Sequence, residues 1–337
     1  MSKSSTLATL TAATLLGATP ALAQPVLEPS ARAFAEAAAA GQPLYDLSYA
    51  DARNVLATVQ AVTLPASAPT TTEDLVWSIG PTGAVRIRIV RPVGADGPLP
   101  AVLYYHGGGW VMGDRNTHDH LIRELAVQTN AAVVFVEYDN APEVRYPENN
   151  EQAYAALEYV AANGGALNID GTRLAVAGDS AGGNMAIAVT LMARERGGPE
   201  ITHQVLFYPV TDDVSTTGSY ETFGEGPFLT RRAMDYFLEA NFPADRRQDV
   251  LAFPLRAPID RLVDLPPATI IVAENDLLRD EGEAYGRRLI EAGVPVTSTR
   301  YNGTIHDFVM LNPLADSTPA RAAIAQAATE LRAAFAR

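Results

Sequence analysis

Short apolar runs alternate with longer helix-like segments through most of the chain. Strands are expected at residues 75–79, 85–90, 101–105, 132–138, 174–177, 204–208, 269–273 and 296–301. Helices are expected at residues 31–40, 49–62, 119–129, 148–162, 184–196, 280–292 and 319–335. Strands that alternate with helices predict a mostly parallel central sheet flanked by helices on both faces. The expected fold class is therefore α/β.

Two segments depart from this alternation. Residues 24–72 are rich in alanine and helical in character, with Ser30 as the expected N-cap of the first helix. They end in a Pro-, Ser- and Thr-rich stretch, residues 63–72, which is typical of a linker. Residues 211–254 are charged and aromatic, and they lie between two expected strands. This insertion is expected to form a lid-like excursion rather than part of the sheet.

Composition narrows the classes of partner and of chemistry. The chain has 337 residues, of which 47% are hydrophobic, enough to bury one large core. Its net charge of −14 argues against nucleic-acid binding, which depends on clustered Lys and Arg. The sequence contains no cysteine, which excludes disulfides, a thiol nucleophile and a lipoprotein anchor.

The first 23 residues have the pattern of a secretory signal peptide. Lys3 supplies positive charge, residues 7–18 are weakly apolar, and Ala-Leu-Ala at residues 21–23 fits a cleavage site. The apolar stretch is too short to cross a bilayer as a retained helix, so no stable membrane insertion is expected. The protein is expected to be exported, to the periplasm or beyond; the alternative is a cytoplasmic protein whose N-terminus is not a signal.

The pentapeptide GDSAG at residues 178–182 is the strongest chemical signal. It follows an expected strand and precedes an expected helix, which is the context of a nucleophile elbow. A serine on so sharp a turn has strained backbone, and the flanking glycines lack the Cβ atoms that would clash there. Ser180 is therefore the candidate nucleophile, and the amide of Ala181 is a candidate oxyanion donor. The alternative is a glycine-rich turn that carries an incidental serine.

A second motif, HGGGW at residues 106–110, follows the expected strand at residues 101–105. Three consecutive glycines leave the backbone free to turn its amides toward one point, as an oxyanion hole requires. A phosphate-binding loop is not supported, because neither GxGxxG nor GxxxxGK[ST] fits this stretch. Together with GDSAG, this motif points to acyl chemistry at a serine.

The catalytic acid and base should follow the serine in the order acid, then histidine. Of the five histidines, only His203 and His306 do so. His203 immediately precedes a strand and is expected at the surface, whereas His306 lies on the loop after the strand at residues 296–301 and is the candidate base. The acid should close the preceding strand, where Asp276 is favoured over Glu274 and Asp280.

The sequence His118-Asp119-His120 suggests a metal site at first sight. On a helix, however, residues i and i+2 point in different directions, and no third ligand is evident nearby. We therefore expect no metal at these histidines. Nothing else in the sequence calls for a cofactor.

These motifs resemble those of the hormone-sensitive-lipase-like esterases, the bacterial family IV carboxylesterases of the α/β-hydrolase fold. The similarity runs from about residue 75 to residue 335. It rests on HGGGW, on YDNAPE at residues 138–143, on GDSAGG at 178–183, on DLLRDE at 276–281 and on GTIH at 303–306. The family commonly has Arg-Leu where this chain has Asp139-Asn140, so that loop is expected to make contacts of its own.

The resemblance implies roles for particular residues. It implies a catalytic triad in which Ser180 is the nucleophile, His306 the base and Asp276 the orienting acid. The implied oxyanion hole is formed by the amides of Gly107, Gly108 and Ala181. The candidate walls of the substrate pocket are Trp110, Phe228 and Val309. The alternative role for each of them is packing in the core or in the cap.

The resemblance further implies a helical cap built from the N-terminal helices and the insertion. The expected organisation is a signal peptide (1–23), cap helices and linker (24–72), a first part of the catalytic domain (73–210), the cap insertion (211–254) and a second part of the catalytic domain (255–337). Because members of the family often pair through an edge strand, a homodimer is implied as well.

The expected activity is that of a serine carboxylesterase acting on small-molecule esters. A preference for short to medium acyl chains follows from the resemblance alone. Two alternatives remain open: a homologue that binds a small ligand without catalysis, and a serine hydrolase of other specificity, such as an amidase, lactonase or acyltransferase. With an ordinary histidine pKa, activity would decline below about pH 6.5.

Overall fold

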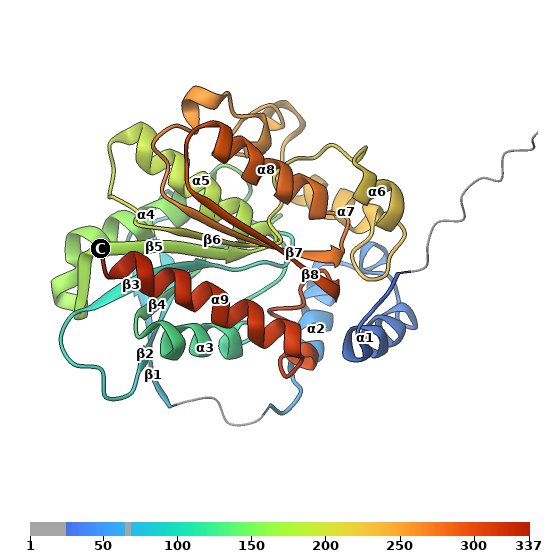
Figure 1. Cartoon of the computed structure of the whole chain (residues 1–337), viewed down its shortest axis with the longest axis horizontal. Helices are drawn as coiled ribbons and strands as arrows, with labels where there is room; N and C mark the ends of the chain where they lie inside the picture. The colour runs from blue at the N-terminus through green and yellow to red at the C-terminus, as the bar shows by residue number, and fades with distance from the viewer. Residues whose placement is uncertain (1–24, 65–68) are drawn as a thin grey trace, which may run out of the picture.

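The computed structural model describes residues 25–64 and 69–337, and within these ranges eight strands form one sheet in the order β1-β2-β4-β3-β5-β6-β7-β8 (Figure 1). The strands are β1 (Thr70–Trp77), β2 (Val85–Pro92), β3 (Leu99–Tyr105), β4 (Ala132–Glu137), β5 (Ile169–Asp179), β6 (Gln204–Phe207), β7 (Ala268–Asn275) and β8 (Val296–Ile305). β2 pairs antiparallel with β1 and β4, and all other neighbours are parallel. The expected mostly parallel sheet is confirmed. The expected signal peptide lies outside the described residues.

Helices cover both faces of this sheet (Figure 1). On one face, α3 (Asp119–Thr129) packs against α9 (Thr318–Phe335); the other face carries α4 (Glu148–Asn163), α5 (Ala181–Arg196) and α8 (Arg279–Glu291). Because both faces are covered, the central strands are apolar along nearly their whole length instead of alternating. Every residue of β3 is buried, as are the first five of β4.

Local signals set the start of the N-terminal helices. The first, α1 (Pro29–Ala39), is capped by Glu28, whose carboxylate accepts hydrogen bonds from the amides of Ser30 and Ala31. The expectation that Ser30 is the N-cap is therefore wrong by two residues. Pro29 explains the shift, because proline lacks an amide hydrogen and its fixed φ suits the first position of a helix.

The expected linker also proved shorter than the composition suggested. Strand β1 begins at Thr70, and Thr72 already pairs with Val90 of β2. Threonine is β-branched and suits a strand, so a Thr-rich stretch beside an available edge is recruited into the sheet.

Two segments distant in sequence form a helical layer at the carboxyl ends of the parallel strands (Figure 1). This helical layer consists of α1, α2 (Tyr49–Gln60), α6 (Gly218–Phe223) and α7 (Arg231–Asn241). The rings of Phe34 and Phe228 meet edge to face with their centroids 5.2 Å apart, and the Tyr49 and Tyr236 rings lie 4.8 Å apart. The insertion thus leaves the sheet, as expected, and packs on the N-terminal helices.

Polar side chains of α2 attach the helical layer to the loops below it. Arg53 donates through Nε to the carbonyl of Val111 at 2.7 Å and through Nη2 to that of Ala141 at 2.9 Å. Gln60 is buried, and its Nε2 donates to the carbonyl of Met310 at 2.9 Å. Each of these bonds satisfies a loop carbonyl that the helical layer shields from water.

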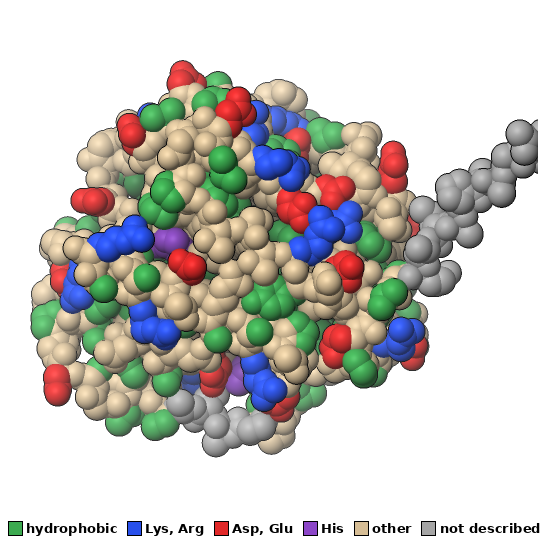
Figure 2. Space-filling model, in the orientation of Figure 1, with side chains coloured by type: hydrophobic (Ala, Val, Ile, Leu, Met, Phe, Trp, Pro, Cys, Tyr) green, Lys and Arg blue, Asp and Glu red, His purple; other side chains and the backbone are tan. Residues whose placement is uncertain are grey.

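The exterior carries charges of both signs. Figure 2 shows acidic and basic side chains interspersed over one face rather than gathered into a basic patch. None of the helices in the described ranges combines the length and apolar character that a bilayer crossing would require. The mixed charges fit a surface that meets water over the face shown.

Candidate active site

The carboxyl ends of parallel strands gather the site residues. In the register of the sheet, β3 and β5 run together up to Tyr105 and Gly178, and β7 and β8 close with Asn275 opposite Ile305. The residues that directly follow these four strands are His106, Ser180, Asp276 and His306. Open parallel sheets hold their functional groups at this edge, outside the carboxyl ends of the strands.

The turn between β5 and α5 is a sharp elbow. Ser180 has φ 52° and ψ −118°, a conformation that costs a residue with a side chain about 1–3 kcal/mol. A Cβ on Gly178 would overlap the carbonyl oxygen of Gly182, and one on Gly182 would overlap that of Tyr105. The two glycines therefore allow the turn to approach β3 closely, and the expected strain at the serine is confirmed.

Three expected site residues meet at this elbow. The Ser180 hydroxyl lies 2.9 Å from Nε2 of His306, and Nδ1 of the same ring lies 2.7 Å from Oδ2 of Asp276. Oδ1 of Asp276 accepts the amide of Leu278 at 3.0 Å, which fixes the carboxylate. The serine, aspartate and histidine are 5%, 2% and 3% exposed. With Nδ1 bound to a carboxylate, the neutral ring carries its proton there and presents Nε2 to the hydroxyl as an acceptor.

The charges around the imidazole shift its titration strongly. Burial lowers the pKa of His306, but the nearby carboxylates Asp276 and Asp307 outweigh burial and raise that pKa to about 9. Burial raises the pKa of Asp307 to about 6, although the positive charge of His306 acts in the opposite direction. The site is therefore a histidine held between carboxylates in a water-poor environment.

The glycine loop after β3 presents fewer free amides than the resemblance implied. The amide of Gly107 donates to Oδ1 of Asp179 at 3.0 Å, so the expectation that it serves the oxyanion hole is wrong. The amides of Gly108 and Gly109, at φ 101° and 61°, donate to no acceptor among the described residues. Nor does that of Ala181, the first residue of α5. Three unpaired amides thus remain near the elbow.

A buried carboxylate organises this loop. Oδ1 of Asp179 also accepts the Tyr104 hydroxyl at 2.7 Å, and its Oδ2 lies 3.3 Å from Nε2 of His118. Burial alone would raise the pKa of Asp179, but His118 and these hydrogen bonds lower it instead. Sequence reasoning missed this cluster, although a polar residue inside the motif and a tyrosine in an otherwise apolar strand were available signals.

The cluster also accounts for His118, the first histidine of the His118-Asp119-His120 sequence. His118 is fully buried and turned toward Asp179, with its Nδ1 2.9 Å from the Thr117 hydroxyl. Across residues 25–64 and 69–337, no group of three or more His, Cys, Asp or Glu side chains could hold a metal ion. The groups that meet at the elbow are a serine hydroxyl, an imidazole and a carboxylate.

The candidate pocket walls lie in different surroundings. Trp110 is fully buried and meets Phe242 edge to face at 4.8 Å, whereas Phe228 packs on Phe34 within the helical layer. Val309 is buried directly after the histidine loop. These contacts agree with packing roles, and a wall role stays a prediction for all three.

No motif or spacing in the sequence singles out Phe237. A Cβ on Gly109 would overlap the Phe237 ring, so this side chain of α7 lies directly over the glycine loop. A substrate acyl or alkyl group bound beside the free amides would have to share this space. Phe237 is therefore a candidate wall that only the packing of α7 on the loop reveals.

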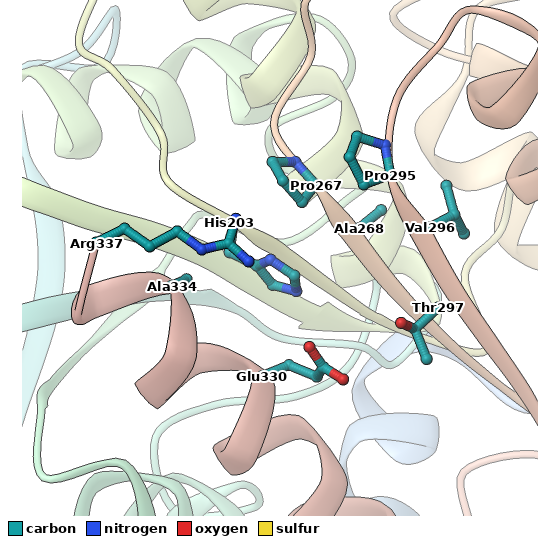
Figure 3. A pocket seen from close by; sticks show the side chains of 9 residues that line it. All are labelled: His203, Pro267, Ala268, Pro295, Val296, Thr297, Glu330, Ala334 and Arg337. Carbon is teal, nitrogen blue, oxygen red and sulfur yellow. The ribbon is translucent and has the colours of Figure 1, made fainter.

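The other histidine that follows the serine lies at the opposite end of the sheet. His203 is 5% exposed, not on the surface as expected, and its Nε2 lies 2.8 Å from the Thr269 hydroxyl. It borders a hollow of about 230 Å³ at the amino ends of β6, β7 and β8, together with Glu330 and Arg337 (Figure 3). Burial, together with the charge of Arg337, lowers the pKa of His203 to about 4. This neutral histidine is far from the elbow and takes no part in it.

Substituting Gly182→Ala should damage the elbow. The added Cβ would overlap the Tyr105 carbonyl, so we expect a loss of about 1–3 kcal/mol in unfolding free energy and a matching fall in the urea midpoint. Gly165→Ala is the control, because open space surrounds its Cβ and the change should stay within about 0.5 kcal/mol. Equal midpoints for both variants would contradict the close approach.

Comparisons with known proteins agree with this geometry. A family model described as the alpha/beta hydrolase fold matches residues 102–310. The carboxylesterase NlhH of Mycobacterium tuberculosis is 40% identical over 227 residues, which cover 67% of this chain and 71% of that protein. The ethyl acetate hydrolase of Pseudomonas putida is 34% identical over 302 residues, or 86% of this chain and 93% of that protein.

Solved structures give the same result. The crystal structure of a thermostable esterase from Pseudomonas putida superimposes with a TM-score of 0.89 at 44% identity, covering 93% of this chain and 98% of that one. Fold, sequence and strand-end geometry agree over nearly the whole described chain. The chain therefore belongs to the α/β-hydrolase fold family, and within it to the hormone-sensitive-lipase-like carboxylesterases of bacterial family IV.

Proposed function

We propose that this carboxylesterase hydrolyses esters of short to medium acyl chains through an acyl-enzyme on Ser180. The observation that carries the proposal is the continuous hydrogen-bonded chain from Asp276 through His306 to the serine hydroxyl, at 2.7 and 2.9 Å. Similarity to an ethyl acetate hydrolase supports the short-chain preference. The burial of the serine beneath the helical layer supports it too, because a bulky acyl chain would need more room.

In the acylation step, Ser180 attacks the ester carbonyl while Nε2 of His306 takes the hydroxyl proton. Asp276 keeps the ring proton on Nδ1 and stabilises the imidazolium that forms, without itself becoming protonated. The imidazolium then delivers its proton to the leaving alcohol. Water attacks the acyl-enzyme in the same manner and releases the acid.

The oxyanion of each tetrahedral intermediate would be held by backbone amides. We assign this role to Gly108, Gly109 and Ala181, whose amides have no competing acceptor in the described part of the chain. Donors of this kind are each worth about 3 kcal/mol of transition-state stabilisation. Gly107 instead positions the loop through its bond to Asp179.

The helical layer is proposed to be the cap of the active site. Its two parts, which lie within residues 25–64 and 211–254, would enclose a catalytic domain formed by residues 69–210 and 255–337. Phe237 lies over the glycine loop and is the strongest candidate for a wall that limits the acyl chain. We also propose pairing of two copies through β8, which has only β7 as a neighbour and is therefore an edge strand.

Replacing the nucleophile tests the proposal most directly. Ser180→Ala should lower ester turnover by at least about 10³-fold, because no other group can form the acyl-enzyme. The urea midpoint should stay near wild type, since alanine occupies the same volume or less. A fluorophosphonate probe should label the wild type but not the variant. Labelling of the variant, or turnover near wild type, would refute the assignment.

Chain-length preference is tested with a series of p-nitrophenyl esters. We expect kcat/KM to peak at short to medium acyl chains, and Phe237→Ala to move the peak to longer ones by opening space beside the glycine loop. An anilide and a lactone assayed beside the esters separate the esterase from an amidase or a lactonase. An unchanged peak in the variant would remove Phe237 from the pocket.

The pH profile should rise toward alkaline pH. Only neutral His306 can accept the serine proton, and its pKa is raised to about 9, so kcat/KM should increase through about pH 9. Below that value it should fall about tenfold per pH unit. Measurement of initial rates between pH 6 and 10, corrected for spontaneous hydrolysis, checks this. An acid limb at the ordinary histidine value would contradict the charge arrangement described.

Export is proposed from the sequence of residues 1–23. The test is N-terminal sequencing of the protein recovered from its native host or from a secreting bacterium. A mature chain that begins close to Gln24 would support removal of a signal peptide. A chain that keeps Ser2 and remains in the cytoplasm would exclude it.

A further inference from the structure

A second carboxylate faces the reacting nitrogen of the histidine. Oδ1 of Asp307 lies 3.3 Å from Nε2 of His306, the same atom that lies 2.9 Å from the Ser180 hydroxyl. This carboxylate oxygen is buried and has no hydrogen-bond partner among the described residues. A buried carboxylate oxygen without a donor is costly, and a positive charge beside it lowers that cost.

The backbone fixes Asp307 in this place. It has φ 63°, in the left-handed region that aspartate and asparagine tolerate better than most residues. Its carbonyl accepts the amides of Met310 and Leu311, both at 3.0 Å, and the amide of Phe308 donates to Ile305. The loop is thus a closed turn that holds the side chain against the imidazole.

We propose that Asp307 is a positioning residue that stabilises the protonated form of His306 and thereby sets the pH at which the enzyme becomes active. The inference rests on the proposed role of His306 as the base. Asp276 also stabilises the imidazolium, but it accepts the Nδ1 proton whether the ring is neutral or charged, whereas Asp307 acts on the ring through its charge alone. Asp307 is attracted to Nε2 only when that nitrogen is protonated and the ring is charged.

The two protonation states differ clearly at this contact. In the neutral ring, the Nε2 lone pair accepts the Ser180 hydroxyl, and the ring has no positive charge for the carboxylate of Asp307 to attract. In the imidazolium, the positive charge of the ring lies 3.3 Å from that oxygen and an ion pair forms in a buried setting, where Coulomb interactions are strong. Burial raises the pKa of Asp307 to about 6, which is still below the value of about 9 for His306. Both groups are therefore charged at neutral pH.

Other titratable groups face this pair and would stay in place if Asp307 were changed. Asp276 at the end of β7 and Asp179 at the end of β5 add negative charge around both residues. His118, from the start of α3, adds positive charge near Asp307. Two buried phenols complete the surroundings: Tyr208, whose ring lies 5.0 Å from the imidazole, and Tyr104 of β3.

The charge of Asp307 has two opposite effects on catalysis: it lowers the fraction of enzyme in which His306 is neutral, and it makes the neutral His306 a stronger base. At neutral pH, most of the enzyme would hold His306 as an ion pair between two carboxylates, unable to take the serine proton. The fraction that is neutral is a stronger base than an ordinary histidine. Loss of the Asp307 charge should therefore increase activity at neutral pH relative to the alkaline plateau.

The test compares Asp307→Asn with the wild type in pH profiles of kcat/KM on a p-nitrophenyl ester. Asparagine keeps the left-handed backbone and the side-chain shape but removes the charge. We expect the acid limb to move down by about 1–3 pH units, the usual effect of one close opposite charge. The ratio of kcat/KM at pH 7 to its plateau should rise at least about tenfold. Asp316→Asn, the same change at an exposed site nearby, should leave the profile unmoved.

A folded Asp307→Asn variant whose acid limb coincides with that of the wild type would overturn the inference. If that variant does not fold, Asp307→Gly replaces it, because glycine adopts the same backbone freely. A uniform loss of activity at every pH, with no shift of the limb, would indicate a merely structural role and also count against it.

Direct titration separates this inference from the proposed function. The imidazole nitrogens of His306 are followed by NMR against pH in the full chain, with wild type and variant compared. A lower histidine pKa in Asp307→Asn supports the inference, even if the ester assay fails. An unchanged value refutes it, even if Ser180→Ala confirms the esterase.

Discussion

The hydrogen bond from the Gly107 amide to the buried carboxylate of Asp179 joins the two motifs on which this site depends. It ties the glycine loop after β3 to the residue that precedes the nucleophile. A side chain at position 107 would overlap that carboxylate, so the close approach requires glycine. The desolvation cost of the charge is offset by the Tyr104 hydroxyl and by His118. With this bond in place, the loop leaves its next two amides unpaired beside the elbow.

Strain and shielding are concentrated at the same place. Ser180 occupies a sparsely populated backbone region, and the surrounding strands and helix α5 hold it there. The helical layer covers this edge of the sheet and is attached by Arg53 and Gln60 to the loops that carry the site. Exclusion of water strengthens the interactions of every charge and dipole inside. The rigid elbow and the helical layer over it thus both favour strong electrostatic interactions at the site.

The negative charge around His306 is the second feature that shapes the chemistry. A triad needs only one carboxylate, at Nδ1, to fix the tautomer. Here Asp307 lies beside Nε2 as well, and Asp179 is close enough to influence the ring. The surrounding carboxylates thereby raise the pKa of the histidine well above its usual value. The net negative charge of the whole chain is not the cause of this effect. Salt screens exposed carboxylates strongly, whereas the buried carboxylates beside His306 are screened much less.

The sequence by itself determined the alternation of strands and helices, the elbow, and the order serine, acid, histidine, because hydrophobic periodicity and glycine placement are local properties. It predicted all eight strands, with each end within five residues of the observed one, and picked out the three side chains that meet at the strand ends. Only the tertiary structure decided which glycine amides stay unpaired, that His203 is buried and that Phe237 covers the glycine loop. The same holds for the second carboxylate at His306. Each of these depends on which atoms face one another across elements distant in sequence, and no local pattern records that.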